Sequence, residues 1–418
     1  MSYFGNLTGR LFSPGFGFFA FVGFIGFTYC VLPLFLFVFF STDEYFLKLA
    51  GLAFFSVVFL LVGYFTPLID GQFSCGVRRV VINSSLFNSL VWTFFLVFAL
   101  YTFFTAPSIP LYSALQGASA DDLSLERGAF FKGRTGAESV LLYLSAIFTT
   151  VLVPYSLVLM YAEGNKFRHL LFVLSFVFCI SFLQKSLFLN VFLPVMVFFA
   201  MQGRLTFRAL MICLFLIIMV LVWAVILSLG DASVEVAGEG LDPACYFSSK
   251  YIPLGAFDYF FWRSFAVPLF TATDTLLVHS EVFEGEFLMG ATSTLLSLIG
   301  GMERINIERF VFQHQFGSWN EIANSNAVFI SDAYVNFGWV GVFLFSLFVG
   351  QVFRWFRLST DVAFKSLWPI FAFTLYSASL IGMLISNGFL YALFHALFLK
   401  ICFFKNNPCS VKIPCSSI

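Results

Sequence analysis

The stretch FGFFAFVGFIGFTYCVLPLFLFVFF, residues 16–40, decides the class of fold, because its 25 residues include no charged side chain. A helix needs about 20 mostly apolar residues to cross the hydrocarbon core of a bilayer. The rest of the chain has the same character, with 60% hydrophobic residues, 11% charged residues and a mean hydropathy of +0.94. An average soluble domain has about 25% charged residues. The sequence therefore predicts an all-α, polytopic integral membrane bundle.

Apolar runs of this kind recur along the chain and predict about ten membrane-spanning helices. They start near Phe16, Phe46, Leu86, Ser139, Phe167, Ser186, Phe207, Val328, Phe364 and Gly388. The fifth and sixth runs are short and meet at Gln184 and Lys185, so they could instead form one re-entrant hairpin. Arg10 alone precedes the first run, and no small-residue cleavage signature follows it, which favours a retained helix over a signal peptide.

The charged residues between the runs sort by sign. A cytoplasmic N-terminus places a basic set on the inner side of the membrane: Arg10, Arg78, Arg79, Lys166, Arg168, Arg204, Arg208, Arg354, Arg357, Lys365, Lys400, Lys405 and Lys412. Only Asp70, Glu163 and Asp361 join them there. Because cytoplasmic loops are enriched in Lys and Arg, we expect a multi-pass membrane protein with both termini in the cytoplasm.

Two long polar segments then lie on the external, non-cytoplasmic side, at residues 106–138 and 230–325. The second contains the apolar stretches Phe257–Phe270 and Thr292–Ile299, which are too short to span and predict interfacial or re-entrant helices. We expect a single membrane domain over residues 1–418 with a flexible cytoplasmic tail at 405–418. The eight cysteines show no metal-ligand spacing, so neither a metal site nor a disulfide framework is predicted.

The first external segment contains ERGAFFKGR, residues 126–134, in which cations alternate with aromatic residues and glycines. Arg offers a planar, permanently charged fork that suits phosphate oxygens. Arg127 and Arg134 are therefore candidates for binding an anionic headgroup. The alternative is an ordinary solvated loop in which Asp121, Asp122 and Glu126 supply counter-charges.

Lys185 lies in SFLQKS, residues 181–186, between two short apolar runs. A charge at the membrane is costly unless it reaches the interface or finds a partner. The ammonium group could hold a phosphate, or the residue could simply mark the tip of a hairpin.

Arg263 lies in FFWRSFAVP, residues 260–268, a strongly aromatic stretch of the second, longer external segment. A cation in such surroundings favours an anionic partner, either a diphosphate or a carboxylate of the bundle. Lys250 and Tyr251, a short distance earlier in the chain, could join the same site. The alternative role is for Arg263 to reach the membrane interface beside Trp262.

The segment ERINIER, residues 303–309, offers Arg304 and Arg309 local ion pairs with Glu303 and Glu308, and this structural interpretation is favoured. His314 follows in a polar context and is the candidate for a proton acceptor near neutral pH.

The eighth predicted span opens with NSNAVFISDAYVNFGWVG, residues 324–341. In a helix, Asp332 and Asn336 share one face with Ser325 or Phe329, and Tyr334 lies on another face. A carboxylate at the start of a span predicts a functional site. The alternative is a structural ion pair between Asp332 and Arg263.

The elements Asn-Ala, Asp-Ala-Tyr and Asn-Phe-Gly-Trp-Val-Gly within residues 324–341 resemble bacterial O-antigen polymerases of the Wzy type. The layout is similar as well, in the number of spans, the basic first periplasmic loop, the Lys between spans five and six, and the Arg263–Pro268 segment of the long loop. The resemblance implies a glycosyltransferase at the periplasmic face of the inner membrane. Such an enzyme joins undecaprenyl-diphosphate-linked oligosaccharide repeat units into O-antigen polysaccharide, within lipopolysaccharide biosynthesis.

The leaving group of that reaction is a diphosphate, so cations would stabilise its charge while a base accepts the proton of the acceptor hydroxyl. The resemblance and the residue patterns together assign diphosphate binding to Arg127, Arg134, Lys185 and Lys250, catalysis to Asp332, Arg263 and His314, and sugar binding to Asn326, Tyr334 and Asn336. No metal or other cofactor is expected. The implied partners are membrane lipids, a chain-length regulator, a flippase and a ligase, and no nucleic acid.

Two other functions remain open at the level of sequence. An O-antigen ligase or related lipid-linked glycosyltransferase would use the same donor, with an external His arranged beside an Arg. A flippase or transporter without chemistry would have charged residues through its spans and repeat-like halves, whereas the spans here are nearly free of charge.

Overall fold

The computed structural model describes residues 8–40, 42–68, 80–131, 134, 136–183, 185–229, 243–317 and 324–402. The predicted flexible tail at 405–418 lies outside these residues, as do Asp70, Arg78, Arg79, Lys405 and Lys412. The protein is mostly helical. This agrees with the predicted all-α membrane protein.

Five helical stretches in the described residues are long and apolar enough to cross a membrane. They are Pro14–Phe40 (α2, η1 and α3), Glu44–Phe65 (α4), Ser84–Phe104 (α6), Val140–Glu163 (α9, η3 and α10) and Phe329–Leu358 (α19). Five of the predicted runs therefore form full-length helices. Those starting near Phe167 and Ser186 form shorter helices, Arg168–Ser181 (α11) and Lys185–Met201 (α12), and Phe207–Leu229 forms α13.

The run predicted from Phe364 is interrupted rather than continuous. It forms Val362–Ser366 (α20), Trp368–Ser377 (α21) and Leu380–Ile385 (α22), followed by Phe389–Phe398 (α23). Ala378 is extended at φ −146° and ψ 163°, and Gly388 is left-handed at φ 76°. Because of these two breaks, the polar residues Ser379 and Ser386 lie at the two ends of the short helix α22.

A proline follows each of the three π-helical segments by two residues. The segments are Phe27–Val31 (η1), Phe148–Leu152 (η3) and Trp262–Ala266 (η4), and the prolines are Pro33, Pro154 and Pro268. Proline has no backbone N–H, and its ring clashes with the carbonyl four residues earlier. A widened turn relieves this conflict without ending the helix.

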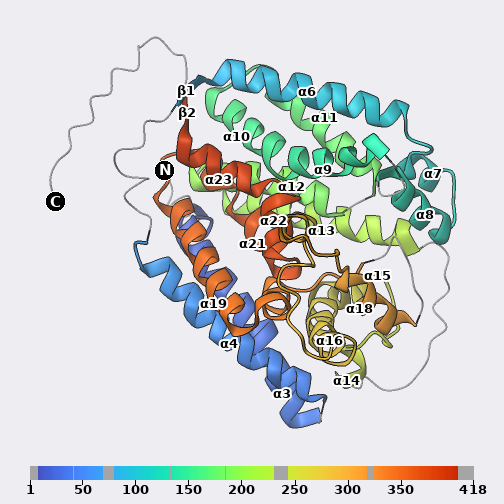
Figure 1. Ribbon diagram of the computed structural model, residues 1–418. Coiled ribbons are helices and arrows are strands. Elements are labelled where there is room, and N and C mark those ends of the chain that lie inside the picture. Colours follow the sequence, from blue (N-terminus) through green and yellow to red (C-terminus); the bar gives the residue numbers. More distant parts are fainter. Residues whose placement is uncertain are drawn as a thin grey trace.

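The tightest packing in the bundle joins α4 to α19 (Figure 1). Gly63 and Gly350 lie where an added Cβ would collide with the backbone of the other helix. Ser56 and Ser346 share a hydrogen bond of 2.7 Å across the same interface. Small residues that allow close backbone approach are typical of helix contacts within membranes.

Short helices of the two long segments gather at one end of the bundle. The first segment forms Pro110–Leu115 (α7), Ala120–Phe131 (α8) and Gly136–Ser139 (η2). The second forms Pro243–Tyr246 (α14), Ala256–Phe261 (α15), η4, Val267–Glu281 (α16), Thr294–Gly300 (α17) and Ile307–Phe316 (α18). The predicted helix over Phe257–Phe270 is thus part of a longer continuous helix, α15–η4–α16.

Two strands, Val80–Asn83 (β1) just before α6 and Leu399–Cys402 (β2) just after α23, form a parallel pair (Figure 1). Both strands belong to segments predicted to be cytoplasmic, so their pairing agrees with the alternation of spans. The orientation of the protein in a membrane stays a prediction.

Candidate functional site

A break in α19 organises the candidate site. Gly338 has φ 63° and ψ −152°, a conformation outside the helical region. The loop before α17 pairs with the backbone ahead of this break: Leu288 N donates to the carbonyl of Val335 at 3.1 Å, and Met289 N donates to the carbonyl of Asn336 at 3.0 Å. A side chain at position 338 would collide with the ring of Phe287. The helix and the second long segment are therefore fixed to each other here.

Asp332 lies about one and a half turns before the break, in a compact polar cluster with Asn336 and Thr292. Asn336 Nδ2 donates to Asp332 Oδ1 at 3.1 Å and to Thr292 Oγ1 at 2.9 Å. Thr292 Oγ1 lies 3.3 Å from Asp332 Oδ1. Asn336 Oδ1 accepts from Gly290 N at 3.0 Å. The spacing prediction that Asp332 and Asn336 share a helix face is confirmed.

The other carboxylate oxygen, Asp332 Oδ2, is buried and has no hydrogen-bond partner among the residues that the structure describes. Buried polar atoms are almost always bonded. Here Oδ1 of the same carboxylate is hydrogen-bonded, so the side chain is held in one orientation. Its unbonded Oδ2 is therefore a candidate for contact with a ligand or substrate.

Asp332 lines a cavity of about 480 Å³ between α9, α16, α17, α18, α19 and α22. Hydroxyl groups dominate its polar wall and come from Tyr143, Thr275, Thr292, Ser293, Thr294, Ser325, Ser379 and Ser386. Leu295, Leu298, Ile381 and Ile385 form an apolar side. Such a combination suits a sugar, which presents hydroxyl groups at its edges and C–H groups on its faces.

Arg304 and Glu308 line the same cavity. Arg304 is exposed and Arg309 is partly buried, and neither forms an ion pair with any described residue, so the predicted local salt bridges of ERINIER are not formed. The cavity thus combines one available guanidinium with the carboxyl groups of Asp332 and Glu308.

A partly buried network of hydrogen bonds joins Ser325, just before α19, to Asp274 of α16 and Gln315 of α18. Gln315 Nε2 donates to Asp274 Oδ2 at 2.7 Å, and Ser325 Oγ donates to Gln315 Oε1 at 2.7 Å. Ser325 N also donates to the carbonyl of Glu308 at 3.1 Å. Burial raises the pKa of Asp274 to about 6, although the bond from Gln315 and the charge of His314 oppose the shift.

Arg127 and Arg263 come together from the two long segments. Their helices, α8 and α15–η4, both pack against α13. Burial lowers the pKa of Arg127; the nearby Tyr259 opposes this shift, and the positive charge of Arg263 adds to it. Arg263 is exposed and forms no ion pair with a described residue. The alternative ion pair between Arg263 and Asp332 is therefore absent.

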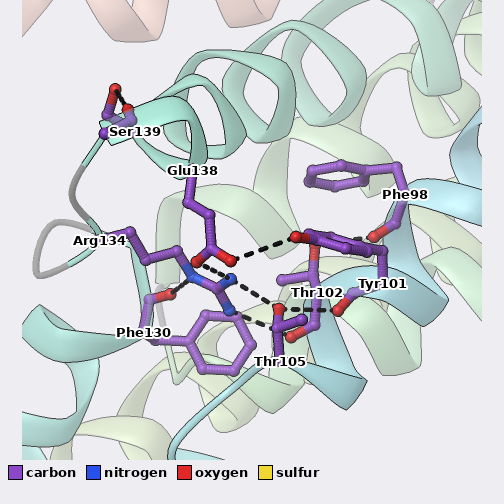
Figure 2. Close-up of polar contacts among 9 residues, drawn as sticks. Phe98, Tyr101, Thr102, Thr105, Phe130, Arg134, Glu138 and Ser139 are labelled. Atoms are coloured by element: carbon purple, nitrogen blue, oxygen red, sulfur yellow. Dashed lines mark hydrogen bonds and ion pairs between the residues drawn. The ribbon is translucent and has the colours of Figure 1, made fainter.

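Arg134 occupies a different, saturated position (Figure 2). Its guanidinium donates to the carbonyls of Phe130 at 2.7 Å and Thr102 at 3.2 Å, and to Thr105 Oγ1 at 2.6 Å. It also forms an ion pair of 3.1 Å with Glu138. These bonds connect the C-terminal end of α6 to the segment after α8. Arg134 therefore has a structural role in this arrangement, and its guanidinium is already occupied.

The remaining predicted residues lie apart from the cavity. Lys250, His314 and Asn326 are exposed, and the side chain of Lys185 lies outside the described residues. The ring of Tyr334 faces Lys48, whose Nζ lies 4.7 Å from the ring centroid, and contacts His279 and Phe287. Asn336 acts on the site through its bonds to Asp332 and does not line the cavity.

The sequence prediction missed Arg304, Glu308 and Thr292 as members of the site. Arg304 and Glu308 each have an opposite charge at the adjacent position, Glu303 and Arg309, and this pattern favours local salt bridges. The one available signal was the polar run Thr292-Ser293-Thr294 beside an apolar stretch. Among the described residues, no three His, Cys, Asp or Glu side chains form a group suited to a metal.

The chain matches no family model, no curated protein and no solved structure.

Proposed function

We propose that this protein is a membrane glycosyltransferase that joins polyprenyl-diphosphate-linked oligosaccharide repeat units into a polysaccharide at the periplasmic face of a bacterial inner membrane. The observation that carries the proposal is the buried Oδ2 of Asp332, which has no hydrogen-bond partner in the described part of the chain and lies in a hydroxyl-lined cavity that also contains Arg304. The resemblance of residues 324–341 to O-antigen polymerases supports the same reaction.

The proposed chemistry is one substitution at an anomeric carbon. The acceptor sugar places a hydroxyl against Asp332 Oδ2, which accepts its proton as the oxygen attacks the anomeric carbon of the donor. The bond from that carbon to the diphosphate oxygen breaks, and the diphosphate leaves with the electron pair. A positioned base contributes typically 10²–10⁴-fold to such a step.

Arg304 would balance the charge that develops on the leaving diphosphate. Fixed positive charge at the place where negative charge appears stabilises the transition state more than the ground state. Asn336 and Thr292 would hold Asp332 Oδ1, so that Oδ2 stays directed to the acceptor; both act as positioning residues.

The apolar face of α17 suits a lipid-linked substrate. Leu298 and Ile299 are 77% and 73% exposed, and Leu298 also lines the cavity. Exposed apolar residues next to a polar cavity fit a site at the edge of the bilayer, where a polyprenyl chain stays in lipid while its sugars react.

Deletion of the gene in its source bacterium, followed by electrophoresis of the lipopolysaccharide, tests the proposal. The polymerase is expected to leave core carrying a single repeat unit, restored to a ladder by the wild-type gene but not by Asp332→Asn. Core without any repeat unit would instead indicate a ligase or flippase, and an unchanged ladder would exclude all three.

A further inference from the structure

Three helix ends meet at the opposite end of α19 from Asp332. Gly15 lies in the first turn of α2, Tyr64 in the last turn of α4 and Arg357 in the last turn of α19. A Cβ added at Gly15 would lie 3.5 Å from the hydroxyl oxygen of Tyr64 and 3.8 Å from Cδ of Arg357. The three residues are therefore direct neighbours, and no side chain of position 15 covers the Tyr64 hydroxyl group.

The ring of Tyr64 is held firmly, whereas its hydroxyl group has no partner among the described residues. The ring stacks on Phe18 with centroids 3.9 Å apart, and the residue is only 1% exposed. The guanidinium carbon of Arg357 lies 4.7 Å from the centroid of the same ring. Because buried polar groups are nearly always hydrogen-bonded, this fixed hydroxyl beside Gly15 is a candidate donor to a ligand.

Arg357 carries a positive charge that no described residue neutralises. It is exposed and forms no ion pair within the described part of the chain. Asp361, the next carboxylate along the chain, accepts from Tyr155 OH and from the first N–H groups of α20. Arg354 differs, because it donates to the carbonyl of Tyr64 at 3.1 Å and so caps α4. The planar guanidinium of Arg357 is thus available for two parallel bonds to phosphate oxygens.

The N-terminus of α2 adds the positive end of a helix dipole to the same place. Ser13 is the N-cap of this helix and Pro14 its first residue, so the N–H of Gly15 is the first that the helix offers. Such N–H groups and the dipole favour an anion. Trp368 holds this end in position, because its Nε1 donates to the carbonyl of Phe12 at 3.1 Å.

The three neighbours lie at the depth of a membrane interface. Gly15, Tyr64 and Arg357 are each one residue from the end of a helical stretch that is long and apolar enough to cross a membrane. A ligand that reaches all three therefore has its charged group at the level of lipid headgroups. This end of the bundle is the one predicted to face the cytoplasm, where anionic lipids attract Arg and Lys.

An exposed aromatic surface lies next to Tyr64. Phe19 and Phe65 are 50% and 58% exposed, and their ring centroids lie 5.9 Å and 5.3 Å from that of Tyr64. Phe19 is one turn further into the span than Gly15. An anionic group at the helix ends and an apolar chain on these rings would both be accommodated, which is the composition of a phospholipid.

We propose that Gly15, Tyr64 and Arg357 bind the phosphate of an anionic phospholipid, with an acyl chain lying on Phe19 and Phe65. Arg357 and the Tyr64 hydroxyl group would donate to the phosphate oxygens, together with the N–H of Gly15. An ethanolamine headgroup would bring a second positive charge beside Arg357, so a headgroup with net negative charge is preferred. The site does not depend on the proposed function, because it lies at the other end of α19 from Asp332.

Binding of phosphatidylglycerol to the delipidated, full-length protein in detergent tests the site, with bound lipid counted by native mass spectrometry. The first phosphatidylglycerol should bind more tightly than phosphatidylethanolamine with the same acyl chains. Arg357→Gln should weaken this binding at least about tenfold, and Tyr64→Phe, which keeps the ring and its contacts, about threefold. Inorganic phosphate at the same concentration should not displace the lipid.

Gly15→Leu and Gly23→Leu form a matched pair within α2. A leucine at position 15 would cover the Tyr64 hydroxyl group and should weaken binding as strongly as Arg357→Gln. Position 23 has no neighbour within 4 Å of an added Cβ, so Gly23→Leu should bind phosphatidylglycerol like the wild type. Melting temperatures of both variants show that they are folded.

Equal binding of phosphatidylglycerol by the wild type and Arg357→Gln would overturn the proposal, as would equal binding of the two lipids by the wild type. Unchanged binding in both Tyr64→Phe and Gly15→Leu would overturn it too, by showing that Arg357 attracts lipids through charge alone. Displacement by inorganic phosphate would identify a soluble anion as the ligand instead. If Arg357→Gln does not fold, Tyr64→Phe and Gly15→Leu decide. Failure of the polymerase tests would leave these binding results unaffected.

Discussion

Asn336 Nδ2 donates to Oδ1 of Asp332 at 3.1 Å, one helical turn away on α19, and no described residue bonds to the second oxygen of that carboxylate. A carboxylate held at one oxygen and open at the other has the geometry of a positioned base. The other bonds of Asn336, to Thr292 and Gly290, show that its amide is itself fixed.

Replacing Asn336 by Asp should therefore slow glycosyl transfer, while the substrates still bind. A second carboxylate in place of the amide donor repels Asp332 and removes its support. We expect the rate of chain growth in a transfer assay to fall at least about tenfold, the effect of about 1.4 kcal/mol, with little change in KM. Thr292→Val is the milder comparison, because Asn336 still supports Asp332 in that variant. Equal rates for Asn336→Asp and wild type would show that Asn336 does not position Asp332.

The break at Gly338 should resist any other residue. Its φ of 63° and ψ of −152° are essentially confined to glycine, and a Cβ would collide with Phe287. Gly338→Ala should cost at least about 1–3 kcal/mol of stability, seen as a lower melting temperature in detergent. Gly51→Ala is the control, because position 51 lies inside α4 with no neighbour within 4 Å of an added Cβ; it should be neutral or slightly stabilising.

Arg134 and Arg304 should separate stability from activity. Arg134→Gln removes an ion pair and several bonds of a buried guanidinium (Figure 2). It should lower the melting temperature, reflecting at least about 2 kcal/mol. Arg304→Gln, at an exposed cation without an ion-pair partner among the described residues, should keep the melting temperature and lose chain growth. An unchanged melting temperature for Arg134→Gln, with loss of farnesyl diphosphate binding, would restore Arg134 as a diphosphate ligand.

Asp274 should make the stability of the protein depend on pH. Its pKa is about 6 in the folded protein and about 3.9 in an unfolded chain. The folded state holds this proton more tightly, so the contribution of the group favours folding at low pH and is lost as pH rises from about 4 to about 6. The loss amounts to about 3 kcal/mol at neutral pH.

Asp274→Asn removes this titration while its amide oxygen can still accept from Gln315. Melting curves between pH 4.5 and 7.5 should show a variant more stable than wild type at pH 7.5 and similar to it at pH 4.5. Parallel pH dependence in the two proteins would mean that Asp274 ionises without cost.

The sequence predicts the class of fold and the helical face of Asp332, because hydropathy and a spacing of four residues are local properties. It does not predict the cavity, since residues 292–308 and 379–386 reach Asp332 only through the break at Gly338 and the interrupted helices after Asp361. Arg304 was missed for the same reason: its charged neighbours along the chain suggest a local ion pair, whereas the fold turns it toward the cavity. For Arg134 the sequence predicts an anion ligand, whereas the structure shows a buried side chain whose hydrogen bonds stabilise the end of α6.

The most direct measurement is transfer by the purified protein with lipid-linked repeat units extracted from the deletion strain. The wild type should convert them into a ladder of longer glycans and release polyprenyl diphosphate. Asp332→Asn, with an unchanged melting temperature, should reduce this rate by at least about 10²-fold. A folded Asp332→Asn protein that extends the glycan at the wild-type rate would contradict the account.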